Sequence, residues 1–270
     1  MTVMRRNIFT YLKEVLIDFC NRNRKGITFL LFLFLIFGVV NNNYAQAWLP
    51  TVEKYLAESK ENPPAPESTF FMGSSTWTQW GKTLEEDFVD YQAVNRGFGG
   101  SRIPDLLAYM DPLMMPYKPT RVLFFCGTND LLRNSPDSVF RDFKTFLGRL
   151  WAVYPETQVY FVSVPHAPSR KKHWDKGDSL NEKVKELAEE DEGLIYIDIV
   201  KDMYNEEDVV NEDFYKSDRL HMNRSGQEIW IPKIKKALDE NPIVKRSKKT
   251  QKRLYKHRKK EGIFQKNSSE

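Results

Sequence analysis

The sequence predicts an α/β fold in which helices cover a parallel sheet on both faces. Short, continuously apolar runs recur along the chain, and the clearest is Arg121–Cys126 (RVLFFC). Between them lie segments with apolar residues at helical spacing, such as Pro136–Tyr154. Strands that are apolar throughout and alternate with helices are typical of parallel sheets buried on both faces. Glycine and polar motifs stand beside several of these runs, where α/β proteins bind ligands.

The predicted elements alternate from residue 69 onward. We expect strands at Thr69–Met72, Tyr91–Asn95, Arg121–Cys126, Gln158–Val164 and Leu194–Ile199. We expect helices at Trp77–Phe88, Ile103–Met110, Pro136–Tyr154, Leu180–Glu190 and Ser225–Leu238. Since the carboxyl ends of parallel strands meet at one edge of a sheet, the motifs beside these strands should gather there.

The N-terminal region predicts export. Ile27–Val40 holds fourteen residues without a charge, and Arg22, Arg24 and Lys25 precede it. A membrane span needs about 20 residues, so the run suits a signal peptide, with cleavage near Ala47. The alternatives are an uncleaved anchor that runs on to Trp48 (residues 27–48) and, with less support, a buried core helix. Both the signal peptide and the anchor place the domain outside the cytoplasm, either periplasmic, secreted or membrane-anchored.

The chain divides into four predicted parts. Residues 1–47 form the basic segment with its signal peptide or anchor, and residues 48–67 form a short helix and a proline-rich linker. Residues 68–242 form the catalytic domain, and residues 243–270 form a basic tail. The tail segment 245–260 is rich in lysine and poor in apolar residues, so we expect it to be disordered. It either binds an anionic surface or has no specific partner.

The net charge of +4 comes from the two ends of the chain. Residues 1–26 carry six basic and two acidic residues, and residues 243–270 carry eleven and two. Subtracting both ends from totals of 41 and 37 leaves 24 basic and 33 acidic residues, a net charge of −9. The basic pI is therefore no argument for a nucleic-acid-binding fold, and no specific nucleic acid is expected. We expect Cys20 and Cys126 to be free thiols.

Two motifs supply the parts of a nucleophilic site. Ser75 follows the first strand and precedes a helix, where a hydroxyl can attack a carbonyl while the backbone N–H stabilises the oxyanion. His221 has Asp218 three residues upstream, and this carboxylate can orient the imidazole so that Nε2 accepts the serine proton. The structural alternatives are a helix-capping serine and a surface histidine beside a chance aspartate. Ser74 could cap the helix in place of Ser75.

Two further motifs supply hydrogen-bond donors. Gly100 lies in the segment Asn95–Ser101, and its missing side chain lets the backbone N–H approach a substrate oxygen closely. Asn129 follows the third strand and can offer a side-chain amide. The structural alternatives are a tight turn at Gly99-Gly100 and an Asx turn at Asn129.

These blocks together resemble those of the SGNH (GDSL-type) hydrolase family over about residues 68–240. Gly73-Ser74-Ser75-Thr76 stands where that family has Gly-Asp-Ser-Leu, and Gly127–Asp130 and Asp218–His221 resemble its later blocks. The resemblance implies a three-layer α/β/α sandwich with a mostly parallel, five-stranded sheet of flavodoxin-like topology. It also implies that Ser75 is the nucleophile, that His221 is the base and that Asp218 orients His221. The oxyanion hole would come from Ser75, Gly100 and Asn129.

The chain departs from the family pattern at Ser74 and Thr76, which weakens any transfer of substrate preference. No metal or cofactor is expected, because the sequence lacks zinc-ligand spacing and a phosphate-binding loop. His166 and the segment Pro165–Arg170 follow the fourth strand and could line the substrate pocket.

The sequence therefore predicts an exported serine esterase that cleaves a small, acetyl-like acyl group from a carbohydrate or lipid ester. One alternative is an acyltransferase that acts on envelope or polysaccharide hydroxyls. Another is a catalytically silent module that binds a surface.

Overall fold

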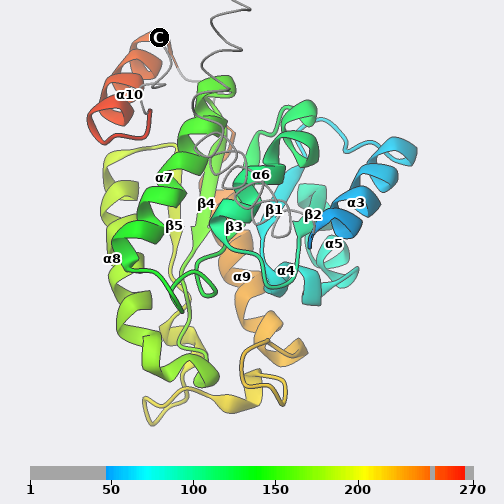
Figure 1. Ribbon diagram of the computed structural model, residues 1–270, viewed down its shortest axis with the longest axis vertical. Helices are drawn as coiled ribbons and strands as arrows, with labels where there is room; N and C mark the ends of the chain where they lie inside the picture. The colour runs from blue at the N-terminus through cyan, green and yellow to red at the C-terminus, as the bar shows by residue number, and fades with distance from the viewer. Residues whose placement is uncertain (1–46, 244–246, 265–270) are drawn as a thin grey trace, which may run out of the picture. The chain divides into compact units, whose positions relative to one another are not determined.

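The structure, a computed structural model, describes residues 47–243 and 247–264 (Figure 1). The elements from residue 51 onward belong to one compact unit. Its sheet has five strands in the order β2-β1-β3-β4-β5, and every neighbouring pair is parallel. The strands are β1 (Thr69–Gly73), β2 (Ala93–Gly97), β3 (Arg121–Phe125), β4 (Gln158–Val162) and β5 (Leu194–Ile197). This order is the flavodoxin-like one, so the predicted fold class is confirmed.

Helices cover both faces of the sheet. The helices of the described residues are α3 (Leu49–Glu61), α4 (Ser75–Trp80), α5 (Thr83–Asp87), α6 (Ile103–Leu113), α7 (Pro136–Val153), α8 (Trp174–Glu190), α9 (Arg224–Glu240) and α10 (Lys248–Lys260), of which α10 lies at the amino ends of the strands. Short 3₁₀ turns lie at Val89–Tyr91, Met115–Tyr117, Pro168–His173, Lys201–Met203 and Glu212–Phe214. Figure 1 shows α7 in front of the strands and α9 behind them. The unit therefore has three layers, helix on sheet on helix.

The core fills the space on each side of the sheet with alternate residues of the same strands. Phe71 of β1 packs in one cluster with Trp77 of α4 and Trp230 of α9. Phe124 of β3 points to the other face, where its ring lies 4.9 Å from that of Phe143 on α7. Because successive strand residues face opposite sides, a strand between two helix layers must be apolar throughout. This explains the continuous apolar runs.

One predicted helix is two helices in the structure. The sequence predicts a single helix over Trp77–Phe88, whereas α4 ends at Trp80 and α5 begins at Thr83. Gly81 between them has a φ of +67° and a ψ of −144°, a backbone conformation that is open to glycine and strained for other residues. The apolar spacing continues across the break, so periodicity alone could not reveal it.

The prediction of a disordered tail is wrong for residues 247–264, which include helix α10. Ser247 caps the helix, because its side chain accepts a hydrogen bond from the Thr250 N–H. Arg258 is 2% exposed and forms a bidentate ion pair with Asp191, which is fully buried. Composition predicts disorder because lysine-rich segments bury little apolar surface. The tail folds because the domain offers a buried carboxylate to one of its arginines.

The predicted signal peptide or anchor and Cys20 lie in residues 1–46, outside the described residues. Cys126 is a buried free thiol, as expected. Among residues 47–243 and 247–264, no helix is both long and apolar enough to cross a membrane.

Candidate active site

The predicted site residues lie at the carboxyl ends of the parallel strands. Ser75 follows β1, Gly100 follows β2 and Asn129 follows β3. Asp218 and His221 lie in the loop before α9. In open parallel sheets, ligands bind beyond these carboxyl ends, beside the strands where the chain order reverses. Here β1 and β3 are neighbours, so Ser75 and Asn129 start from adjacent strands.

Ser75 is the first residue of α4, at a tightly packed turn. A Cβ atom on Gly73 would lie 2.1 Å from the Phe125 carbonyl oxygen, so glycine is required where β1 ends beside β3. Ser74 occupies the N-cap position, but its side chain makes no capping hydrogen bond, so the suggested capping role is wrong. The Ser75 N–H lies in the first turn of α4, where N–H groups have no intrahelical partner.

The three predicted catalytic side chains form one hydrogen-bonded chain. Ser75 Oγ lies 2.8 Å from His221 Nε2, and His221 Nδ1 lies 2.6 Å from Asp218 Oδ2. Burial acts to raise the pKa of Asp218, but hydrogen bonds from the His221 side chain and from the backbone N–H groups of His221 and Leu220 lower it to about 2. The carboxylate is therefore charged at neutral pH. It holds His221 in the tautomer that leaves Nε2 free to accept the Ser75 proton.

Hydrogen bonds within the loop that carries Asp218 and His221 fix its shape. Asp218 Oδ1 accepts hydrogen bonds of 2.9 Å from the N–H groups of both Leu220 and His221. The Lys216 N–H donates to the His221 carbonyl over 2.7 Å, and its Nζ donates to Gln79 Oε1 on α4 over 2.6 Å. Asp218 therefore orients the imidazole and also shapes the backbone that presents it.

Two of the three predicted oxyanion donors, Gly100 and Asn129, lie on facing turns. Asn129 Nδ2 donates to the Ser101 carbonyl over 3.1 Å, which uses one of its two N–H groups and leaves one for a ligand. Gly100 has a φ of +76°, and a Cβ on its neighbour Gly99 would lie 3.9 Å from Ser75 Cβ. The turn is thus close to Ser75. Asn129 lines the pocket beside Ser75, whereas Gly100 is not among the residues that line it.

A buried carboxylate lies beneath this pair of turns. Asp130 is fully buried, and its Oδ1 accepts a 3.0 Å hydrogen bond from the Ile103 N–H at the start of α6. Burial raises the pKa of Asp130 to about 6, although the Ile103 N–H acts in the opposite direction. Burial also raises the pKa of Cys126, whose thiol is within 3.9 Å of Asp130, so this cysteine stays protonated. These contacts join the turn after β2 to the turn after β3.

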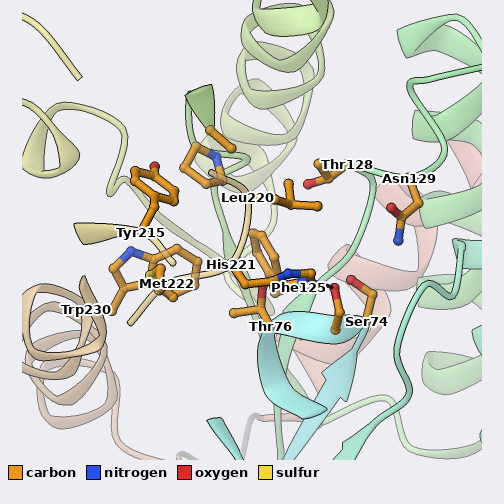
Figure 2. A pocket seen from close by; sticks show the side chains of 13 residues that line it. Ser74, Thr76, Phe125, Thr128, Asn129, Tyr215, Leu220, His221, Met222 and Trp230 are labelled. Atoms are coloured by element: carbon orange, nitrogen blue, oxygen red, sulfur yellow. Dashed lines mark hydrogen bonds between the residues drawn. The ribbon is translucent and has the colours of Figure 1, made fainter. Parts of the chain in front are cut away.

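The pocket at Ser75 is small and has a polar and an apolar side. Its volume is about 20 Å³, the room taken by one or two water molecules. Figure 2 shows Thr128 and Asn129 on one side of His221, and Tyr215, Met222 and Trp230 on the other. Such a pocket accommodates a short apolar group next to a polar reaction centre.

Sequence reasoning missed the lining residues that come from the last loop and from α9. Tyr215 is 6% exposed, and its hydroxyl has no hydrogen-bond partner among the described residues. Burial raises the pKa of Tyr215, so the hydroxyl stays protonated. Trp230 reaches the pocket from the second turn of α9. No local motif marks either residue, because each reaches the site through the packing of α9 on the sheet.

The segment after β4 contributes differently from the prediction. Pro165 and Ala167 line the pocket, but His166 does not. The His166 ring stacks on Trp174 at 4.6 Å, and its Nε2 lies 2.8 Å from Asp178 Oδ1. His166 therefore links this loop to α8.

In the part of the chain that the structure describes, one group of side chains is arranged so that it could hold a metal ion. It consists of Glu190, His257 and Glu261, whose ligand atoms lie within 4.8 Å of one another. It lies where α10 meets α8 and contains none of the residues around Ser75.

The sequence model of the GDSL-like lipase/acylhydrolase family matches residues 61–229. The chain belongs to this family. A putative acylhydrolase from Bacteroides fragilis is structurally similar, with a TM-score of 0.61 and 21% identity, over 70% of this chain and 95% of that one. A GDSL-like lipase from Bacteroides thetaiotaomicron has a TM-score of 0.59 and 21% identity, over 71% and 98%. A carbohydrate esterase family 3 protein from Talaromyces cellulolyticus has a TM-score of 0.53 and 14% identity, over 64% and 97%.

No curated protein sequence matches this GDSL-like hydrolase significantly. Membership in the family makes the protein a carboxylic ester hydrolase. Its substrates are therefore esters. The matched region contains Ser75, Gly100, Asn129, Asp218 and His221.

Proposed function

We propose that this GDSL-like hydrolase is an exported serine esterase that removes a short, acetyl-like acyl group from a carbohydrate or lipid ester. The observation that carries the proposal is the chain of short contacts from Asp218 through His221 to Ser75. The small volume of the pocket beside Ser75 supports a short acyl group. Two structural neighbours support an acetyl or sugar ester, because one is named an acetyl esterase with bound acetate and the other a carbohydrate esterase.

The proposed reaction passes through an acyl-enzyme. His221 Nε2 accepts the Ser75 hydroxyl proton while Oγ attacks the ester carbonyl, and the new oxyanion is stabilised by donors from Ser75, Gly100 and Asn129. The tetrahedral intermediate collapses, and His221 gives the proton to the leaving alcohol. Water then attacks the acyl-enzyme by the same route, which releases the acid and restores Ser75. Asp218 remains ionised throughout and stabilises the imidazolium.

Export and surface contact are part of the same proposal. They rest on the apolar run Ile27–Val40 with its preceding positive charges, and on the basic composition of residues 245–260. The domain would then act outside the cytoplasm, and residues 27–48 would provide a membrane contact.

Labelling with a fluorophosphonate probe tests the mechanism. We expect the wild-type protein to be labelled and the Ser75→Ala and His221→Ala variants to lose labelling. Ser74→Ala is the matched control, because it removes the adjacent hydroxyl and should leave labelling intact. Labelling that survives Ser75→Ala would disprove the assignment of the nucleophile.

A panel of p-nitrophenyl esters from acetyl to palmitoyl tests the acyl group. We expect kcat/KM to fall as the chain lengthens, since the pocket is small. A rise toward palmitoyl would refute the short-acyl proposal. Acyl transfer to an added sugar that is faster than hydrolysis would identify the protein as an acyltransferase instead.

A further inference from the structure

The C-terminal helix is built into the domain. Arg258 of α10 enters a buried site, where its guanidinium pairs with Asp191 and lies 3.6 Å from the centre of the Trp151 ring. A Cβ on Gly193 would lie 2.4 Å from Arg258 Nη2, and a Cβ on Gly148 would lie 2.1 Å from the Ile263 carbonyl oxygen. The domain thus has glycines at two points where α10 and its following turn approach most closely. The helix therefore holds a fixed orientation on the domain.

This fixed orientation sorts the basic residues of α10 into two classes. Both arginines form ion pairs with the domain, Arg258 with Asp191 and Arg253 with Glu192. The lysines of the helix are all exposed, and none forms an ion pair among the described residues; they are Lys248, Lys249, Lys252, Lys256, Lys259 and Lys260. We call these six residues the lysine face.

An aromatic pair accompanies the lysine face. Tyr255 is 56% exposed, and its ring lies 5.2 Å from that of Phe264. Lysines together with exposed aromatic rings on a helix are typical of helices that lie on a bilayer surface, where the rings reach the headgroup level and the lysines meet lipid phosphates. The exposed side of a single helix is convex. It therefore fits a flat partner such as a bilayer better than an extended polymer chain that binds in a groove.

The lysine face and the candidate active site lie at opposite ends of the strands. Arg258 contacts Pro155 and Asp191, which precede β4 and β5, whereas Ser75 follows β1 and Asn129 follows β3. Since all five strands are parallel, the first pair lies at the amino ends of the strands and the second pair at the carboxyl ends. In Figure 1, α10 accordingly lies at the upper end of the strands, far from the loop that leads into α9.

We propose that the lysine face is a docking surface for an anionic phospholipid bilayer, which would hold the domain with its active site turned away from the membrane. The charge complementarity is local, since residues 27–242 carry a net charge of −9 and are repelled by the same surface. The substrate would then be a soluble or polymeric ester rather than a lipid of the docked bilayer. This proposal is independent of the esterase chemistry, because vesicle binding can fail while Ser75 still hydrolyses esters.

The test compares two full-length variants with the same change in charge. One carries Lys249→Gln, Lys252→Gln, Lys256→Gln and Lys260→Gln on the lysine face. The control carries Lys60→Gln, Lys82→Gln, Lys172→Gln and Lys185→Gln, at exposed lysines of other elements. Binding is measured by co-sedimentation with phosphatidylcholine vesicles, with and without 30% phosphatidylglycerol, at low and high salt. Thermal unfolding and p-nitrophenyl acetate hydrolysis are measured in parallel.

The wild-type protein should bind the anionic vesicles more tightly than the neutral ones, and this preference should weaken with salt. Each lysine removed from the lysine face should lower the preference about fivefold. The control variant should keep most of this preference, and both variants should keep their thermal stability and esterase activity. Equal losses in the two variants would overturn the proposal, as would binding to heparin or DNA that exceeds binding to anionic vesicles.

Chemical footprinting provides a readout that does not depend on overall affinity. Anionic vesicles should protect the lysine face from an amine-reactive reagent more than neutral vesicles do, while Lys82 and Lys185 stay equally reactive. Unchanged reactivity of the lysine face in vesicle-bound protein would also overturn the proposal.

Discussion

Two aspartates of this protein each hold a basic side chain, one at the carboxyl ends of the strands and the other at their amino ends. The two pairs differ in how far they are exposed to solvent. The side chains of Asp218 and His221 are 46% and 16% exposed, and the pair ends at the Ser75 hydroxyl. The side chains of Asp191 and Arg258 are 0% and 2% exposed, and the guanidinium is held by two carboxylate oxygens, a carbonyl oxygen and an aromatic ring.

This difference separates the pair that we propose to be catalytic from a structural pair. His221 keeps one nitrogen for a hydroxyl whose proton can leave, and the pocket beside it admits a ligand. The Arg258 guanidinium is covered by Asp191, Pro155 and the Trp151 ring, so it offers no group to a ligand. Removal of the first pair should therefore affect turnover, and removal of the second should affect stability.

The largest effect should come from Asp218→Asn, which removes the acceptor that fixes the His221 tautomer. We expect turnover of p-nitrophenyl acetate to fall about 10⁴-fold, with little change in thermal unfolding. Asp213→Asn, an exposed aspartate in the same loop region, is the control. Activity within tenfold of wild type would mean that Asp218 only shapes the loop.

A smaller effect should follow Arg258→Ala, which leaves the Asp191 carboxylate buried without its cation. We expect the free energy of unfolding in urea to fall by about 3–5 kcal/mol, with kcat unchanged. Arg253→Ala removes an exposed ion pair of the same helix and should cost about 1 kcal/mol or less. Equal losses in both variants would show that burial does not distinguish the two arginines.

Asn129→Ala should lower kcat about 10²- to 10³-fold, because it removes one of the proposed oxyanion donors beside Ser75. The KM should change less than kcat, since the hydrogen bond forms in the transition state. Asn134→Ala, a few residues later in the chain, serves as the control. A change in KM alone would indicate that Asn129 binds the ground state of the substrate.

The smallest effect should be the pH dependence that Asp130 gives to stability. Its pKa is about 6 in the folded protein, above the ordinary value of 3.8, so its favourable contribution is present below pH 4 and is lost as the pH rises through 6. Between pH 7 and pH 4, the free energy of unfolding of the wild-type protein should therefore rise on the order of 2 kcal/mol more than that of Asp130→Asn. Urea unfolding at both values measures this difference. If the two proteins differed in free energy of unfolding by the same amount at pH 4 and at pH 7, burial would not raise the pKa of Asp130.

Sequence reasoning predicted the strands, and it selected Asp218, His221 and Ser75, which the structure joins in one hydrogen-bonded chain. Both predictions depend on local sequence patterns. Apolar runs such as that of β3 must be continuous when helices cover both faces. The spacing between Asp218 and His221 is short enough for one loop to join them. By contrast, the break at Gly81 was missed, because the apolar spacing continues across it.

The amino-acid sequence by itself determined the α/β class and the order of the elements, and it marked the five candidate site residues, because these depend on periodicity and on short motifs. Only the tertiary structure decided that residues 247–264 fold onto the domain and that Tyr215 and Trp230 line the pocket. Arg258 lies 67 residues from Asp191 in the chain, so no local pattern reveals their contact. The site that Arg258 enters is built from Trp151, Pro155 and Asp191, so it exists only in the folded domain.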